Sequence, residues 1–109
     1  MHELSISRSV VDMCVERAMG AQVKRVTLVV GQLSAVLPDS LRFCFDICAE
    51  GTPVEGALLE IIEVPGMAVC RDCGDDVALT QPFGRCACGS VDLQFVAGEE
   101  LNVKEMEVA

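Results

Sequence analysis

Apolar side chains near the N-terminus recur at a helical period and predict an amphipathic helix over residues 4–19. The positions on its stripe are Leu4, Val11, Cys14 and Ala18. After a short link, residues 24–31 alternate between two faces, with Val26, Leu28 and Val30 on one of them. This alternation is typical of a strand. The first third of the chain is therefore expected to form a helix followed by a strand.

The middle and the end of the chain predict one more helix and two more strands. The helix begins at Pro38 or Asp39 and runs to about Ala49. Its buried side is expected to carry Leu41, Cys44, Phe45 and Cys48. Residues 57–64 are apolar enough to predict a central strand, and residues 99–109 return to strand character.

This order of elements predicts an α+β fold, in which two helices pack on a three-stranded sheet. The composition changes after Pro65, because residues 66–98 contain four cysteines and few large apolar side chains. We expect these residues to form a small β module inserted into the larger domain. The predicted division is therefore 1–65 plus 99–109 for the α/β domain and 66–98 for the module.

Composition narrows the class of protein. Hydrophobic residues make up 51% of the 109 positions, which excludes a disordered chain. The net charge of −9 argues against nucleic-acid binding and is compatible with holding a cation. No secretory signal and no apolar run of membrane-spanning length is present, so we expect a cytoplasmic protein. In that reducing compartment, seven cysteines are expected to be thiols or metal ligands.

The four cysteines of residues 66–98 have the spacing of a structural zinc site. Cys70 and Cys73 are followed by twelve residues and then by Cys86 and Cys88. A module this small has too little core to fold alone, and structural zinc adds roughly 10–16 kcal/mol of apparent binding energy to such modules. We therefore predict a zinc-ribbon-like site with four thiolate ligands.

Three other uses of these cysteines fit less well. A redox pair lacks the expected βαβ context, disulfides are rare in the cytosol, and four thiolates leave a zinc ion no open position for catalysis. The second pair is irregular, because Cys86-Ala87-Cys88 is one residue shorter than the usual spacing. We expect this short pair to disturb the turn around the metal.

The remaining cysteines are expected to be core residues. Cys44 and Cys48 are spaced four apart, a spacing that allows both to bind one metal, but Leu41 and Phe45 beside them favour burial. Cys14 lies on the apolar stripe of the first helix. No phosphate-binding loop, nucleophile elbow or zinc-protease motif appears, so the sequence predicts a protein that is not an enzyme.

The one histidine of the chain is residue 2, directly after Met1. The free α-amine, the amide nitrogen of His2 and its imidazole can close fused chelate rings around one ion, and square-planar nitrogen ligands suit Ni(II) or Cu(II). An isolated terminal histidine is more often a solvated residue. Glu3 gains interest from its place beside His2, either as a metal ligand or as a hydrogen-bond partner of the ring. Asp39 is more simply a residue at the start of a helix.

The opening Met1-His2-Glu3-Leu4-Ser5-Ile6 and the two cysteine pairs together resemble the HypA/HybF family of hydrogenase nickel-maturation proteins. The likeness extends over nearly the whole chain, including residues 31–34, 41–46 and 98–104. Two features depart from the family pattern. The family's second pair is normally C-P-x-C, and the histidines that some relatives carry beside their cysteines are missing here.

The resemblance implies a nickel-binding domain and a zinc-binding domain. It implies that Met1, His2 and Glu3 hold Ni(II) as cargo, while Cys70, Cys73, Cys86 and Cys88 hold structural Zn(II). It also implies delivery of nickel to the large-subunit precursor of a [NiFe] hydrogenase in cooperation with a HypB-type GTPase. Two rival functions remain open: a zinc-ribbon interaction module without any nickel function, and a zinc-dependent enzyme, for which no open metal site is found.

Overall fold

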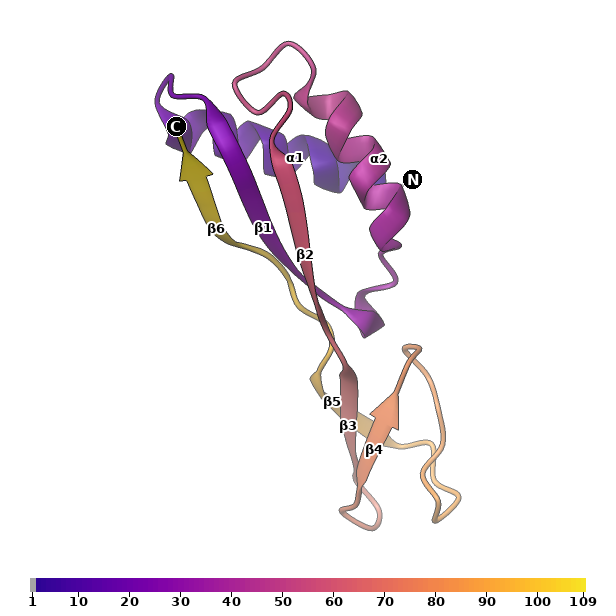
Figure 1. Ribbon diagram of the computed structural model, residues 1–109. Helices are drawn as coiled ribbons and strands as arrows, with labels where there is room; N and C mark the ends of the chain where they lie inside the picture. Colours follow the sequence, from indigo (N-terminus) through magenta and orange to yellow (C-terminus); the bar gives the residue numbers. More distant parts are fainter. Residues whose placement is uncertain (1) are drawn as a thin grey trace. The chain divides into compact units, whose positions relative to one another are not determined.

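The computed structural model describes residues 2–109, which form two compact units (Figure 1). The helical unit contains the residues before Val29 together with Val36–Ile62 and Asn102–Ala109. The cysteine unit contains Val29–Ala35 and Glu63–Leu101. Both units are therefore assembled from stretches of chain that are separated in sequence. The α+β class predicted from the sequence is confirmed, with two helices and two small sheets.

The first helix, α1, spans His2–Ala18 and starts two residues earlier than the apolar spacing predicts. Its buried residues are Ser7, Val10, Val11, Cys14 and Ala18. Leu4, which the spacing places on the buried stripe, is 42% exposed. Ser7 is buried instead, because its hydroxyl donates to the Leu41 carbonyl at 3.3 Å and so keeps a hydrogen-bond partner. The helix ends near the predicted residue 19, and Gly20 follows it with a φ of +88°.

The second helix, α2, spans Pro38–Ala49, where the sequence predicts it. A proline fits this first position, since the first backbone N–H of a helix has no partner within the helix. The buried residues of α2 are Leu41, Cys44, Phe45, Cys48 and Ala49. They pack against α1, and Phe45 is among the largest fully buried side chains of the protein. The two helices thus share one aliphatic and aromatic core.

The strands of the first sheet are arranged in the order β2-β1-β6. Their bounds are Val23–Gly31 for β1, Leu58–Val64 for β2 and Leu101–Val108 for β6. Figure 1 shows α1 running across these strands. On β1, three consecutive side chains are buried, from Val26 to Leu28. Both faces of this strand are therefore covered.

The expectation that residues 57–64 form a central strand is wrong, because β2 lies at the edge of its sheet. Arg25 of β1 lies between Glu60 of β2 at 3.2 Å and Glu107 of β6 at 3.1 Å, which fits β1 in the middle. Leu58 and Ile62 of β2 remain 59% and 41% exposed. Apolar composition alone therefore misplaced this strand, since its hydrophobic residues are not all covered by a neighbour.

The cysteine unit contains a three-stranded antiparallel sheet in the order β4-β3-β5. Its strands are β3 at Gly66–Cys70, β4 at Asp76–Leu79 and β5 at Leu93–Ala97. The core of this unit is small. It consists of Leu33, Ala68 and Leu79, with Val77, Leu93 and Phe95 packed against them.

Leu33 belongs to a short 3-10 helix, Gln32–Ser34, which the hydrophobic pattern does not predict. Its amide donates to the carbonyl of Gly98 at 2.7 Å. Three glycines allow this close packing, because a Cβ on Gly31 would collide with the Gly98 carbonyl and one on Gly98 would lie 2.6 Å from the Cα of Gly66. Residues 29–35 consequently belong to the cysteine unit.

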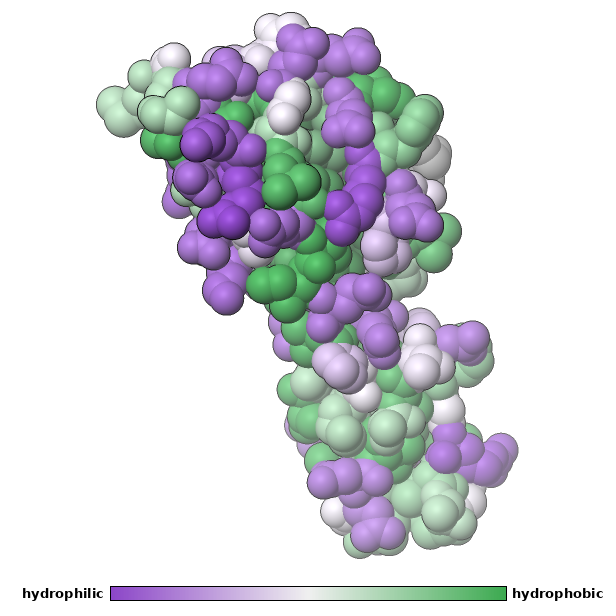
Figure 2. Space-filling model, viewed as in Figure 1, coloured by the Kyte–Doolittle hydropathy of each residue, from purple (hydrophilic) through white to green (hydrophobic). Residues whose placement is uncertain are grey.

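The surface mixes charged side chains with scattered apolar ones (Figure 2). The exposed large apolar side chains occur in both units, and the most exposed aromatic ones are Phe43 at 68% and Phe83 at 70%. Within residues 2–109, no helix has the length and apolar character needed to cross a membrane.

Candidate metal centres

The four cysteines that the sequence singles out come together in the cysteine unit. Their sulfur atoms all lie within 4.8 Å of one another. Cys70 is the last residue of β3, Cys73 lies in the turn before β4, and Cys86 and Cys88 lie between β4 and β5. The Sγ atoms of Cys70 and Cys88 are 3.7 Å apart, and those of Cys73 and Cys86 are 3.5 Å apart. The turn after β3 and the segment between β4 and β5 therefore bring the two cysteine pairs into one cluster.

These distances fit a tetrahedral zinc ion. Sulfurs placed about 2.3 Å from a tetrahedral zinc lie about 3.8 Å from one another, close to the observed separations. A disulfide needs sulfurs about 2.0 Å apart, and all four thiols are free. Cys70 and Cys86 are buried, whereas Cys73 and Cys88 are exposed. The cluster thus has the donor set of a structural zinc site at the surface of the unit.

Each cysteine pair is followed by a glycine that closes a turn. The amide of Gly74 donates to the Cys70 carbonyl at 2.8 Å, and the amide of Gly89 donates to the Cys86 carbonyl at 2.9 Å. Both glycines have a positive φ, +81° and +94°, which a residue with a side chain rarely adopts. Cys86 and Cys88 therefore keep a closed turn that is one residue shorter than the turn at Cys70 and Cys73. The short spacing changes the length of this turn but does not abolish it.

Backbone amides face the sulfurs and favour their ionised form. The amide of Cys73, and also that of Asp72, lowers the pKa of the Cys70 thiol to about 7. The pKa of Cys73 rises to about 12, since the nearby thiols outweigh the opposing effect of the Asp75 amide. The cluster therefore has one thiol, Cys70, that ionises near neutrality, while the pKa values of Cys73 and Cys88 are raised by the neighbouring thiols.

A link between the two cysteine turns was missed by the sequence reasoning. The hydroxyl of Ser90, after the second pair, donates to the carboxylate of Asp72 within the first pair. The amide of Asp92 donates to the Ser90 hydroxyl at 3.1 Å, and the Asp92 carboxylate lies 3.5 Å from the Arg71 guanidinium. We call these four residues the polar strap. No spacing rule predicts it, because its members have no fixed offset from the cysteines.

The second predicted site lies at the start of α1. Met1 lies outside the described residues, so the geometry concerns His2 and Glu3. The Nε2 atom of His2 lies 3.3 Å from Oε2 of Glu3, and the side chain of Glu3 is only 12% exposed. The amide of Leu37, just before α2, donates to the same Oε2 at 3.4 Å. Glu3 therefore links the His2 ring to the beginning of the second helix.

This arrangement affects the charge of Glu3. The Leu37 amide and the neighbouring His2 ring hold the pKa of the Glu3 carboxyl below its usual value, against the opposing effect of desolvation. The carboxylate is thus ionised under ordinary conditions and accepts hydrogen bonds. Leu37 was not a predicted site residue, since a backbone amide leaves no trace in the sequence.

Asp39 lies in the same neighbourhood. Glu3 and Asp39 line one hollow of about 380 Å³ together with Ser40, Phe43 and Cys44. Within the described part of the chain, residues 2–109, the Asp39 carboxylate forms no side-chain hydrogen bond or ion pair, so the structure does not join it to His2 or Glu3. Among residues 2–109, the four cysteines form the one group of three or more ligating side chains close enough to share an ion.

The other three cysteines are buried core residues, as predicted. Cys14, Cys44 and Cys48 are at most 5% exposed. Burial raises the pKa of the Cys14 thiol, which opposes ionisation and metal binding there. The seven cysteines thus form two groups: four that lie close enough to bind one metal ion and three that are buried in the core.

Comparison with known proteins gives a consistent result across the chain. The profile of the family described as HypA, hydrogenase/urease nickel incorporation, metallochaperone, matches residues 1–108. A hydrogenase maturation factor HypA from Trichormus variabilis is 56% identical over 108 residues, covering 99% of this chain and 96% of that protein. The factor of the same name from Rippkaea orientalis is 57% identical over 109 residues, with the same coverage.

A solved structure is also similar. The solution structure of the Ni metallochaperone HypA from Helicobacter pylori matches with a TM-score of 0.66 and 25% sequence identity. The match covers 97% of this chain and 96% of that one. The similarity therefore extends over both units and not over a single motif.

Proposed function

The chain belongs to the HypA family of nickel-incorporation metallochaperones, and we propose that it binds Ni(II) at its N-terminus and delivers the ion for maturation of [NiFe] hydrogenase. On this proposal nickel is cargo, and the protein is a carrier and not an enzyme. Its mechanism must therefore allow both capture of the ion and its release to a partner.

The contact between His2 and Glu3 carries the proposal. A chelate ring that includes the amide nitrogen of His2 can close only through Nδ1 of the same ring, because Nε2 lies on the far side. The Glu3 carboxylate lies 3.3 Å from Nε2, and a negative charge at this distance favours a proton on that nitrogen. A neutral imidazole with its proton on Nε2 has a free lone pair on Nδ1. Glu3 therefore selects the form of His2 that the chelate requires.

The remaining ligands come from the chain end. The α-amine of Met1 and the amide nitrogen of His2 complete three nitrogen donors, which suit square-planar Ni(II). Glu3 acts on nickel indirectly, by orienting the His2 ring. Removing such a partner of a metal ligand typically lowers the metal affinity of the site by about 10–100-fold. Because the amine and imidazole must be unprotonated to bind, protons compete with nickel and acidification favours release.

The zinc cluster has a different role. We propose that Cys70, Cys73, Cys86 and Cys88 hold Zn(II) permanently and that the ion stabilises the cysteine unit. The proposal is supported by the sulfur distances and by the absence of an open ligand position in a four-thiolate site. The cluster differs from the terminal site in that two of its four sulfurs belong to buried residues, Cys70 and Cys86.

The cellular setting follows from the same proposal. We propose that the protein works in the cytoplasm with a HypB-type GTPase and transfers nickel to the large-subunit precursor of the hydrogenase. The relatives from Trichormus variabilis and Rippkaea orientalis are hydrogenase maturation factors, which supports involvement in hydrogenase maturation. The competing function is a zinc-ribbon interaction module in which His2 has no metal role.

Native mass spectrometry on untagged protein, titrated with Ni(II) near neutral pH, distinguishes a nickel carrier from a zinc-ribbon interaction module. We expect one nickel ion per chain in addition to one zinc. His2→Ala and a form with extra residues before Met1 are expected to lose nickel but keep zinc. Glu3→Gln should weaken nickel binding by about 10–100-fold, whereas Glu16→Gln, an exposed position on the same helix, should leave it unchanged.

Two results would contradict the proposal. Uptake of nickel by His2→Ala or by the extended form at the wild-type level would place the ion elsewhere. Equal nickel affinities for Glu3→Gln and Glu16→Gln would remove the role of Glu3 while leaving the terminal chelate in place.

A further inference from the structure

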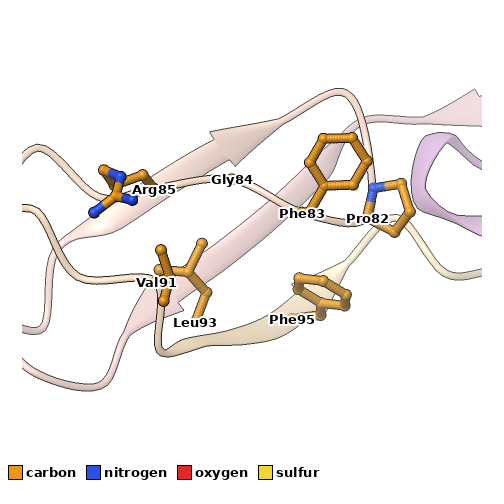
Figure 3. Close-up of a pocket in the computed structure, with 7 residues that line it drawn as sticks. All are labelled: Pro82, Phe83, Gly84, Arg85, Val91, Leu93 and Phe95. Atoms are coloured by element: carbon orange, nitrogen blue, oxygen red, sulfur yellow. The ribbon is translucent and has the colours of Figure 1, made fainter.

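The cysteine unit has an apolar groove that neither metal site uses (Figure 3). Its volume is about 490 Å³. One wall is formed by residues 82–85, and the other by Val91 with Leu93 and Phe95 of β5. Figure 3 shows Phe83 and Phe95 facing each other at one end, with Arg85 at the other. The groove is therefore apolar along its length and cationic at one end.

The walls are held in place by the core of the unit. Leu93 and Phe95 pack against the cluster of Leu33, Ala68 and Leu79. The opposite wall lies directly on that cluster, because a Cβ on Gly84 would lie 2.5 Å from the Cδ2 atom of Leu79. The groove thus exists in the folded unit before any ligand is present.

The groove exposes side chains that proteins usually bury. Phe83 is 70% exposed and Val91 is 64% exposed. The chain has four phenylalanines and neither tryptophan nor tyrosine, and two of the four line this groove. Grouped exposed apolar side chains of this kind mark interaction sites.

Arg85 indicates which charge the ligand carries. One of its N–H groups donates to the carbonyl of Gly89 at 2.6 Å, which fixes the guanidinium. Within residues 2–109 no carboxylate pairs with it, although the chain has a net charge of −9. A fixed guanidinium with free donors favours a carboxylate, which it binds with paired hydrogen bonds.

We propose that this groove binds an extended segment of a partner protein that presents two apolar side chains and a carboxylate. In an extended chain, side chains two residues apart face the same way and are about 7 Å apart. Such a pair lies along the aromatic and aliphatic part of the groove, and the carboxylate reaches Arg85. The interaction is separate from nickel binding, so either is testable without the other.

The test uses the full zinc-containing chain and a synthetic peptide, Ac-Glu-Ser-Leu-Ser-Val-Ser-Glu-amide. Its acids at both ends allow either chain direction to reach Arg85. In an NMR titration we expect shifts at residues 82–85 and 91–95, with binding weaker by about tenfold or more for Phe83→Ser and for Arg85→Glu. A peptide with lysine in place of both glutamates should bind more weakly, although the acidic protein would attract it non-specifically.

Two matched variants serve as controls. Phe43→Ser removes an equally exposed phenylalanine from the helical unit, and Arg8→Glu makes the same change of charge on α1. Both should bind the peptide like the wild type, and all four variants should keep their zinc. The proposal is overturned if the lysine peptide binds as well as the acidic one. It also fails if Phe83→Ser and Phe43→Ser bind alike, or if no shifts appear at millimolar peptide.

Discussion

The two units of this protein reach a stable fold by different means. The helical unit buries Phe45 and Leu41 of α2 against Val11 of α1, all at 1% exposure or less. The hydrophobic cluster of the cysteine unit is smaller and is built on three buried residues, Leu33, Ala68 and Leu79. Four thiols lie close together in the cysteine unit, and small units with so little core are commonly stabilised by a structural metal. One unit is therefore held by side-chain burial and the other, we propose, by a metal.

This contrast has a consequence for function. A unit whose fold depends on its metal cannot release that metal without unfolding, so it is unsuited to carrying cargo. The helical unit has a buried side-chain core of its own, so on the proposed function its N-terminal ligands exchange an ion without loss of the fold. The two proposed metal roles thus follow from the two ways of folding.

Removing one thiolate is expected to have the largest effect. In Cys73→Ser, three ligands remain, and we expect most of the roughly 10–16 kcal/mol that structural zinc supplies in small modules to be lost. Metal analysis should show zinc-free protein. Amide signals of residues 66–98 should collapse toward the unfolded positions, while those of α1 and α2 persist.

Cys14→Ser is the control for this change. It alters a cysteine of the helical unit that is 2% exposed and should leave the zinc content at one ion per chain. The contrast between the units breaks down if Cys73→Ser retains its zinc, or if its helices unfold together with the cysteine unit.

A second substitution lowers the stability of the helical unit and leaves the cysteine cluster untouched. Phe45→Ala leaves a cavity in its core, and such truncations cost about 3–5 kcal/mol. Circular dichroism during urea unfolding should show the helices melting at a lower concentration. The zinc content should not change, because Phe45 has no part in the cysteine unit.

Phe43→Ala is the control, since this neighbouring ring is 68% exposed and its loss should change stability by less than about 0.5 kcal/mol. Loss of zinc from Phe45→Ala would show that the two units fold as one cooperative body and would remove the contrast.

Much of the fold could be predicted from local sequence patterns. The position of α2 and the burial of Cys44 and Cys48 follow from helical spacing, and the cysteine cluster follows from its own spacing. The buried face of α1 could not be fully predicted, because Ser7 is buried through a hydrogen bond to residue 41 while Leu4 is exposed. The edge position of β2 was missed for a similar reason. Strand order depends on which strands pair, and apolar composition does not report pairing.

Long-range contacts also explain what was missed at the two sites. The Leu37 amide reaches Glu3 across 34 positions, and Ser90 reaches Asp72 across 18. The crossing of Gly31, Gly66 and Gly98 draws residues 29–35 into the cysteine unit. The predicted boundaries after residues 65 and 98 were placed by composition alone and stay a prediction. Contacts between distant segments leave no periodic signal, so a single sequence does not reveal them.

The smallest expected effect concerns the polar strap between the two cysteine turns. Ser90→Ala removes the hydroxyl that joins Asp72 to Asp92. The amide of Cys86 still donates to the backbone carbonyl of residue 90, so the short turn is kept. A hydrogen bond of this kind contributes about 0.5–1.5 kcal/mol, which corresponds to at most about tenfold faster zinc loss.

The measurement is the rate at which a coloured chelator removes zinc from the folded protein. Ser9→Ala, an exposed serine on α1, should release zinc at the wild-type rate. If Ser90→Ala also does so, the thiolates alone align the two turns and the strap is only a surface contact. If zinc release accelerates several-fold, even the metal-held unit depends in part on ordinary hydrogen bonds. The contrast between the units is then one of degree: the metal supplies most of the stability of the cysteine unit, and the polar strap slows the release of the metal.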